Sequence, residues 1–210
     1  MVKKEKISKT LLLDKKAIIL ALILGVLLAF LDIYFLILML VFLFLGVIVT
    51  KHGYNEKKEM GVYEHERGWE NVLANGLVPL IGGAFFNPGA FIGALAAVMA
   101  DKFASELGIL EKSDPINLKN LKRTKKGTNG AISLFGTWMS FIGALLIGVV
   151  ALFLYPEYNL WKVLLIGVIG FIGSFVDSVF GVFEEKGIGT KATTNIICAI
   201  FGLILGYLFI

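Results

Sequence analysis

The sequence predicts an all-α fold, a polytopic membrane bundle of about seven transmembrane helices. Of the 210 residues, 57% are hydrophobic and only 17% are charged, and the mean hydropathy is +0.83. The apolar residues gather in runs of roughly 20 residues, the length that crosses a bilayer as a helix. Polar or glycine-containing turns separate these runs. This composition excludes a soluble domain and favours one integral membrane domain over residues 1–210.

The first two helices share one apolar run, from Ala17 to Val49. This run is about twice as long as a single span requires, and Asp32 interrupts it near the middle. We therefore expect a helical hairpin, with helices at roughly 16–32 and 33–50. The basic N-terminus resembles the start of a signal peptide, but the apolar run is too long and no small-x-small cleavage site follows it.

Polar segments separate the later helices. Residues 51–70 form a polar loop, and Asn87-Pro88-Gly89 marks a tight turn. A basic loop covers residues 109–126. The two histidines of the 51–70 loop, His52 and His65, lack a His or Cys partner at metal-ligand spacing and are interpreted as solvated loop residues. The five further helices are expected at roughly 70–86, 88–108, 130–155, 160–182 and 192–210. The single cysteine, Cys198, lies in an apolar run and is interpreted as a buried core residue.

The distribution of lysine and arginine predicts the orientation. With seven helices, one side of the membrane holds the N-terminal segment and the loops at 51–70, 109–126 and 183–191. These segments carry nearly all the lysines and arginines. Positive residues are retained on the cytoplasmic side of a membrane. We therefore expect a multi-pass protein of the cell membrane with a cytoplasmic N-terminus. The polar ends of the helices should then meet at the cytoplasmic face.

Two acids near the ends of apolar runs are the strongest candidates for chemistry. Asp101 ends the run that begins near Pro88, and Asp177 ends a second run. An ionisable group in a membrane helix is costly, so it marks a functional site when a partner or metal can be named. We assign Asp101 and Asp177 as catalytic and metal-binding residues, with Glu106 as a further metal ligand. Mg²⁺ is the expected cation, since it binds carboxylates and bridges phosphates.

A glycine-rich turn, Gly127-Thr128-Asn129-Gly130, precedes the fifth helix and follows several cations. Free backbone N–H groups and the positive end of a helix dipole suit phosphate, so this turn is a candidate phosphate site. An ordinary helix cap would have the same sequence, and no GxxxxGK[ST] loop is present. The complete set of expected substrate- or phosphate-binding residues is Arg67, Asn71, Asn75, Ser105, Lys125, Lys126, Thr128, Asn129, Gly130, Ser178, Thr194 and Asn195. For Asn71 and Asn75, hydrogen bonding between helices is the alternative.

Phosphoryl transfer is the reaction that best accounts for two acids, many cations and glycine-rich helix starts at one membrane face. The apolar helices would hold a lipid tail, with its headgroup at the level of the loops. An ion or small-solute transporter that uses Asp101 and Asp177 is the alternative, because acids facing a cavity also mark ion pathways. The motifs of CDP-alcohol phosphotransferases and of DDxxD prenyltransferases are absent. A purely structural scaffold would leave the converging polar groups unexplained.

Four motifs carry a resemblance to a known family: RGWENVLANG (67–76), ADKFASELG (100–108), KKGTNGAISLFGT (125–137) and GSFVDSVFG (173–181). Together they resemble the integral membrane family of transmembrane protein 19 and the plant phytyl-phosphate kinase. The likeness covers most of residues 65–200. Two positions depart from the family pattern: Lys102 replaces a small hydroxyl residue, and Val182-Phe183-Glu184 replaces a small-and-glutamine ending.

The resemblance implies a kinase, distantly like CTP-dependent dolichol kinases, that converts an isoprenoid monophosphate to its diphosphate. It implies CTP or another nucleoside triphosphate as the phosphoryl donor and Mg²⁺ as the cofactor. It also implies that Arg67 and Asn75 hold the prenyl phosphate while the 127–130 turn holds the nucleotide. The expected partners are therefore an isoprenoid lipid, a nucleotide and membrane lipid, with no nucleic acid. A homodimer is compatible with the sequence.

Overall fold

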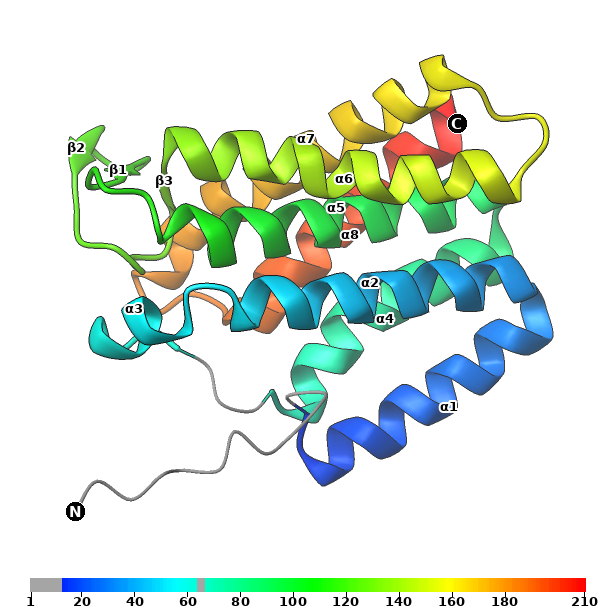
Figure 1. Cartoon of the computed structure of the whole chain (residues 1–210), viewed down its shortest axis with the longest axis horizontal. Helices are drawn as coiled ribbons and strands as arrows, with labels where there is room; N and C mark the ends of the chain where they lie inside the picture. Colours follow the sequence, from blue (N-terminus) through cyan, green and yellow to red (C-terminus); the bar gives the residue numbers. More distant parts are fainter. Residues whose placement is uncertain (1–12, 64–66) are drawn as a thin grey trace.

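A computed structural model describes residues 13–63 and 67–210. Eight helices make up most of this part of the chain (Figure 1). Their bounds are α1 Lys15–Leu31, α2 Ile33–Lys51, α3 Tyr54–Glu59, α4 Trp69–Phe85, α5 Pro88–Gly108, α6 Leu134–Leu154, α7 Leu160–Glu184 and α8 Lys191–Phe209. The loop histidine His65 and the N-terminal lysines Lys3, Lys4, Lys6 and Lys9 lie outside the described residues.

The long helices begin and end where the side chains of the turns provide caps. The Asp32 side chain accepts a hydrogen bond from the Tyr34 N–H and separates α1 from α2. Asn87 and Asn159 cap α5 and α7 in the same way, and Pro88 occupies the first turn of α5. These residues satisfy N–H groups that have no partner within the helix. The helix order therefore follows from local sequence signals.

Helix α5 lies at the centre of the bundle and packs against α2, α4, α6, α7 and α8. Its apolar residues from Ala90 to Ala100 are almost completely buried. At Gly93, an added Cβ would lie 2.7 Å from the Cα of Gly206, so α5 and α8 touch through their backbones. Both helices carry a GxxxG spacing, Gly89 to Gly93 and Gly202 to Gly206, which permits such close contact in membranes.

Large apolar side chains cover the outside of the bundle. Phe30 and Phe153 are more than four-fifths exposed, and similar residues lie along the outer faces of α1, α2, α6, α7 and α8. Within the described residues, α2, α6, α7 and α8 are each long and apolar enough to cross a membrane. An apolar exterior of this extent suits contact with lipid. The protein is therefore a helical membrane protein with at least these four candidate spans.

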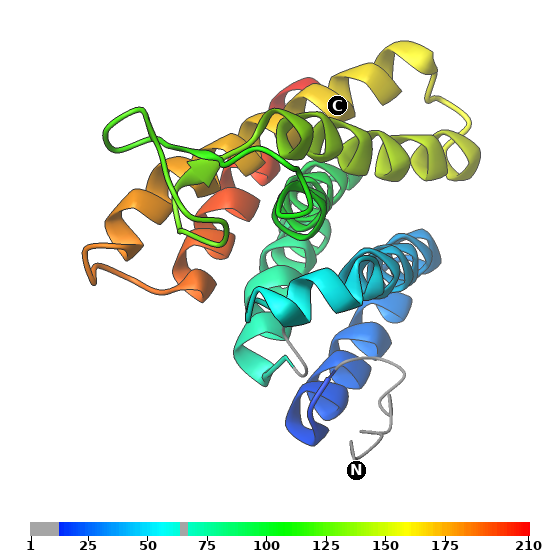
Figure 2. The ribbon, with the colours of Figure 1, turned by 60° about the vertical axis from the view of Figure 1, so that its left-hand side comes forward.

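Residues 109–133 differ from the predicted basic loop. They contain a small antiparallel sheet in the order β2-β1-β3, formed by β1 Ile116–Asn117, β2 Lys122–Arg123 and β3 Ala131–Ile132. Leu121, at the turn between β1 and β2, has a positive φ of 57°. Helix α6 consequently begins at Leu134 with Ser133 as its cap, so the 127–130 turn does not open this helix as predicted. The 109–133 segment lies beside the end of α7 (Figure 2).

Candidate functional site

The polar segments of the chain gather at one end of the bundle. Helix α3, the 109–133 segment and the α7–α8 connection all lie at the left of Figure 1. The short turns at 32, 86–87 and 155–159 lie at the other end. The end of α5 that carries Asp101 and the end of α7 that carries Asp177 both reach the polar end. This arrangement brings residues that are distant in sequence into one region.

Asp101 and Asp177 share a single cation, Lys191 at the start of α8. The Lys191 Nζ lies 2.7 Å from Asp177 Oδ2 and 3.5 Å from Asp101 Oδ2. Both aspartates are buried, at 8% and 5% exposure. The Asp177 Oδ1 atom is also buried and has no hydrogen-bond partner among the described residues. Two carboxylates, one of them with an unpartnered oxygen, thus meet at the junction of α5, α7 and α8.

A cavity of about 180 Å³ opens beside these two acids. Its walls are the polar end of α5, the start of α6, the last turns of α7, the 126–133 segment and Lys191. Of the residues predicted to form the site, the cavity wall includes Asp101, Ser105, Lys126, Thr128, Asn129, Gly130, Asp177 and Ser178. The structure thus brings the two acids and the glycine-rich turn together, although that turn is separated from the helix.

The glycine-rich turn is fixed against α7 by close backbone packing. Gly130 has a φ of +72°, and a Cβ there would lie 2.7 Å from the Val182 backbone nitrogen. A Cβ on Gly181 would lie 2.6 Å from the Gly130 nitrogen. Glu185 accepts a hydrogen bond from the Asn129 N–H at 3.0 Å. The turn is therefore held in one conformation, with Lys126 beside it bonded to the Glu111 carbonyl.

Glu106, predicted as a further metal ligand, belongs to a separate cluster of charged residues. Its carboxylate pairs with Lys57 at 2.8 Å, Arg67 at 2.7 Å and Lys102 at 2.7 Å. The Thr50 hydroxyl also lies 2.9 Å from this carboxylate. Glu106 thus pairs with three cations and is not part of the cavity wall.

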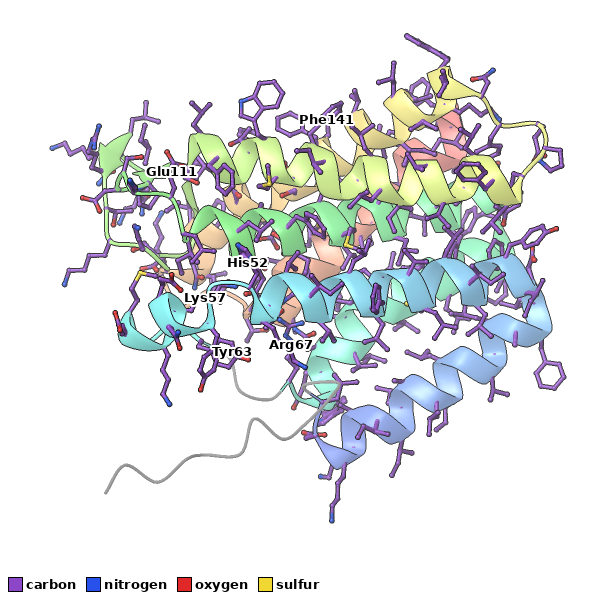
Figure 3. The ribbon with its side chains drawn as sticks, viewed as in Figure 1. His52, Lys57, Tyr63, Arg67, Glu111 and Phe141 are labelled. Atoms are coloured by element: carbon purple, nitrogen blue, oxygen red, sulfur yellow. The ribbon has the colours of Figure 1, made fainter. Side chains whose placement is uncertain are left out.

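The cations of this cluster come from three different elements. Lys57 belongs to α3, Arg67 precedes α4 and Lys102 belongs to α5; Figure 3 shows Lys57 and Arg67 at the same end of the bundle. Lys57 is 1% exposed and donates further hydrogen bonds to the Val49 and Thr50 carbonyls. Arg67, predicted as a phosphate-binding residue, pairs with Glu106 and is not part of the cavity wall. Lys102 pairs with Glu106 in this same cluster.

The predicted asparagines form a hydrogen-bonded series between α4 and α8. Asn75 donates to Asn71 at 3.0 Å, and Asn195 donates to Asn75 at 3.1 Å. The Asn195 Oδ1 atom is buried and has no partner among the described residues. Asn75 thus joins α4 to α8, whereas its bond to Asn71 lies within α4. Lys125, Thr194 and these three asparagines are not part of the cavity wall.

Sequence reasoning missed Lys191 and Glu184 as residues of the cavity. Lys191 was counted only as a positive charge of a cytoplasmic loop, and Glu184 only as a departure from the family pattern. A helical projection could have found Lys191, because it lies one turn before Asn195 on the same face of α8. The contact with both aspartates depends on how α8 packs against α5 and α7, which a single sequence does not reveal.

The two aspartates fit a magnesium ion of the type that bridges phosphates. Such an ion needs only one or two carboxylates from the protein, with water and phosphate oxygens as its other ligands. Asp101 and Asp177 supply that number, and the free Oδ1 atom of Asp177 is a suitable donor. Among the described residues, no group of three or more His, Cys, Asp or Glu side chains could enclose a metal fully. The donor set therefore suits a metal that arrives with a phosphate ligand.

Comparison with known proteins places the chain in a family. The family model described as "Integral membrane protein DUF92" matches residues 6–199. An uncharacterized membrane protein of Methanocaldococcus jannaschii is 39% identical over 211 residues, covering 96% of this chain and 87% of the relative. No solved structure matches. The chain therefore belongs to the integral membrane protein family DUF92, the family of transmembrane protein 19-like proteins.

Proposed function

We propose that this protein is a membrane kinase that transfers a phosphoryl group from a nucleoside triphosphate, with CTP favoured, to an isoprenoid monophosphate. The product is the isoprenoid diphosphate. One observation carries the proposal: Asp101, Asp177, Lys191 and the glycine-rich turn line a single cavity at the polar end of apolar helices. Acids that can hold a cation, beside backbone N–H groups and lysines, form a site suited to phosphate chemistry.

The cavity also has an apolar side that suits a lipid. Phe171 and Phe175 on α7 belong to its wall, and Phe175 is 44% exposed on the outside of the bundle. The cavity therefore reaches from charged residues to a surface that would contact lipid tails. A prenyl chain could lie along these phenylalanines with its phosphate near the aspartates. Ser105, Ser178 and Thr137 supply hydroxyl groups on the same wall.

In this proposal, each group has a distinct role. Asp101 and Asp177 would hold Mg²⁺, which would neutralise charge on the transferred phosphoryl group. Lys126 and the 127–130 turn would bind the nucleotide phosphates. The attacking atom is an oxygen of the prenyl monophosphate, which is already anionic, so no strong general base is required. Exclusion of water by the surrounding helices would favour transfer to the lipid over hydrolysis.

The proposal includes the predicted orientation. In it, α1, α4 and α5 cross the cell membrane together with the four candidate spans, and the N-terminus and the cavity lie on the cytoplasmic side. The cations at the polar end of the bundle support this placement: Lys126 and Lys191 in the cavity wall, and Lys57 and Lys102 in the Glu106 cluster. Nucleotides are available on that side. Cysteine labelling from either side of sealed vesicles would test the topology.

The purified protein in detergent should be incubated with Mg²⁺, geranylgeranyl phosphate and either CTP or ATP. We expect mass spectrometry to detect geranylgeranyl diphosphate with the wild type but not with Asp101→Asn or Asp177→Asn. A Lys162→Gln variant, altered at the opposite end of the bundle, is the control and should retain activity. Full activity of Asp101→Asn would contradict the metal assignment. Absence of product from a folded wild type with every nucleotide would contradict the kinase.

The transporter alternative rests on the same buried acids. Asp101 and Asp177 lie within helices, pair with a lysine and face a cavity, as acids of ion pathways also do. Liposomes containing the protein would distinguish the two functions. Cation or proton flux without nucleotide, lost in Asp177→Asn, would favour transport.

A further inference from the structure

Lys191 occupies the position between the acids that a metal ion would need. Its Nζ lies 2.7 Å from Asp177 Oδ2 and 3.5 Å from Asp101 Oδ2. An ammonium group and a divalent cation that approach the same oxygens repel each other at short distance. The lysine and the metal should therefore not share these oxygens at the same time.

The charges around the cavity show why an exchange is favourable. The wall carries three acids, Asp101, Asp177 and Glu184, and two lysines, Lys126 and Lys191, for a net charge of −1. A divalent cation would change this charge to +1, which attracts phosphate. With Lys191 in place, Asp177 Oδ1 is still without a hydrogen-bond partner. The lysine thus leaves the coordinating capacity of the acids partly unused.

The surroundings of Lys191 allow its side chain to leave the acids without displacing a helix. Lys191 is the first residue of α8, directly after the capping residue Thr190. Its side chain is 44% exposed, whereas those of Asp177 and Asp101 are 7% and 12% exposed. A lysine ammonium sits on a flexible four-carbon stem. The carboxylates are thus held in place, and the cation is the movable partner.

We propose that Lys191 is a resident counter-ion of Asp101 and Asp177 that a divalent cation displaces. The displaced ammonium stays at the cavity wall and binds a phosphate of the nucleotide. Before the cation arrives, Lys191 limits the electrostatic cost of two buried carboxylates. This inference rests on the proposed kinase function, but its first half concerns cation binding alone and can be measured separately.

The test compares Mn²⁺ binding by the wild type and by Lys191→Met, in nanodiscs without nucleotide, from the electron paramagnetic resonance signal of free Mn²⁺. We expect Lys191→Met to bind Mn²⁺ about tenfold more tightly or better, because a competing charge at hydrogen-bond distance is removed. Lys191→Gln is a second neutral variant with the same expectation. Lys191→Arg keeps the charge and should bind as weakly as the wild type.

Lys186→Met is the matched control, since Lys186 lies in the same α7–α8 connection but not in the cavity wall. It should leave the Mn²⁺ affinity unchanged, and Asp177→Asn should weaken binding. Equal or weaker Mn²⁺ binding by folded Lys191→Met and Lys191→Gln would overturn the inference. Tighter binding in these variants, together with no diphosphate from the wild type, would support the counter-ion role and contradict the kinase.

The second part of the proposal, that the displaced Lys191 binds a nucleotide phosphate, predicts a change in nucleotide affinity. In Lys191→Met, the KM for the nucleotide should rise about tenfold while the KM for the prenyl phosphate changes little, because one phosphate contact is lost. Lys191→Arg should largely restore the nucleotide KM. An unchanged nucleotide KM in Lys191→Met would refute the phosphate contact and restrict Lys191 to the counter-ion role.

Discussion

Replacing Glu106 with glutamine tests whether this residue stabilises the fold or binds a metal. The carboxylate is 13% exposed and pairs with three cations, at 2.7 to 2.8 Å. Glutamine has nearly the same shape as glutamate, but its neutral side chain cannot neutralise the three cations. Loss of the partner from a buried ion pair typically costs about 3–5 kcal/mol. Lys57 retains its bonds to two carbonyl groups, so we expect about 3 kcal/mol, the lower end of that range.

Thermal unfolding in detergent, followed by circular dichroism, measures the change in stability. The Glu106→Gln variant should unfold at a temperature several degrees lower, since about 1 kcal/mol shifts the midpoint by roughly 2–4 °C in a chain of this size. Lys102→Met is a milder control because it leaves Glu106 with Lys57 and Arg67. The Mn²⁺ affinity of folded Glu106→Gln should equal that of the wild type. An unchanged unfolding temperature together with weaker Mn²⁺ binding would refute the structural role.

Three further predictions concern glycines and a loop acid. Gly93→Ala should lower the unfolding temperature, because its Cβ would meet the α8 backbone at 2.7 Å, whereas Gly46→Ala, with nothing within 4 Å, should not. Gly130→Ala should destabilise the protein more than Gly61→Ala. Both glycines have a positive φ, but only a Cβ at Gly130 would collide with α7. Faster proteolysis of the 109–133 segment in Gly130→Ala would report the difference. Hydrogen bonds from Ser113 and the Phe135 N–H lower the pKa of Glu111. The stabilisation that ionised Glu111 contributes is therefore present above the usual glutamate pKa and is lost as the pH falls through the lowered pKa of the folded protein. The unfolding temperatures of wild type and Glu111→Gln should therefore converge in acid.

The sequence was a good guide to helices because the relevant signals are local. Asp32, Asn87 and Asn159 cap helices where apolar runs are interrupted, so boundaries could be located within a few residues. The small sheet at 116–132 was not predicted, since strands of two residues carry no alternating pattern. The start of α6 was placed too early because Gly130 resembles a helix start, but its positive φ belongs to the turn before β3.

The candidate site could be predicted only in part. Acids at the ends of apolar runs stand out because charge is rare there, and Asp101 and Asp177 do lie beside one cavity. Which cation pairs with which acid was harder to predict, since ion pairing depends on how the helices rotate and pack. Glu106 lies five residues after Asp101 and points to another face of α5, where Lys57 and Arg67 reach it. Lysines counted together as positive charge thus have different roles: Lys57 stabilises the fold, and Lys191 contacts the acids.

The glycine contact between α5 and α8 explains how Lys191 reaches Asp101. The helices are antiparallel and touch where Gly93 faces Gly202 and Gly206. From this contact, Asp101 lies eight residues along α5, about 12 Å, and Lys191 lies eleven residues back from Gly202 along α8, about 16 Å. The flexible four-carbon side chain of Lys191 is long enough to span this difference and reach both acids. A shift of α8 by one turn, about 5 Å, would separate the lysine from the acids. The small residues at one end of the bundle therefore determine the charge pairing at the other.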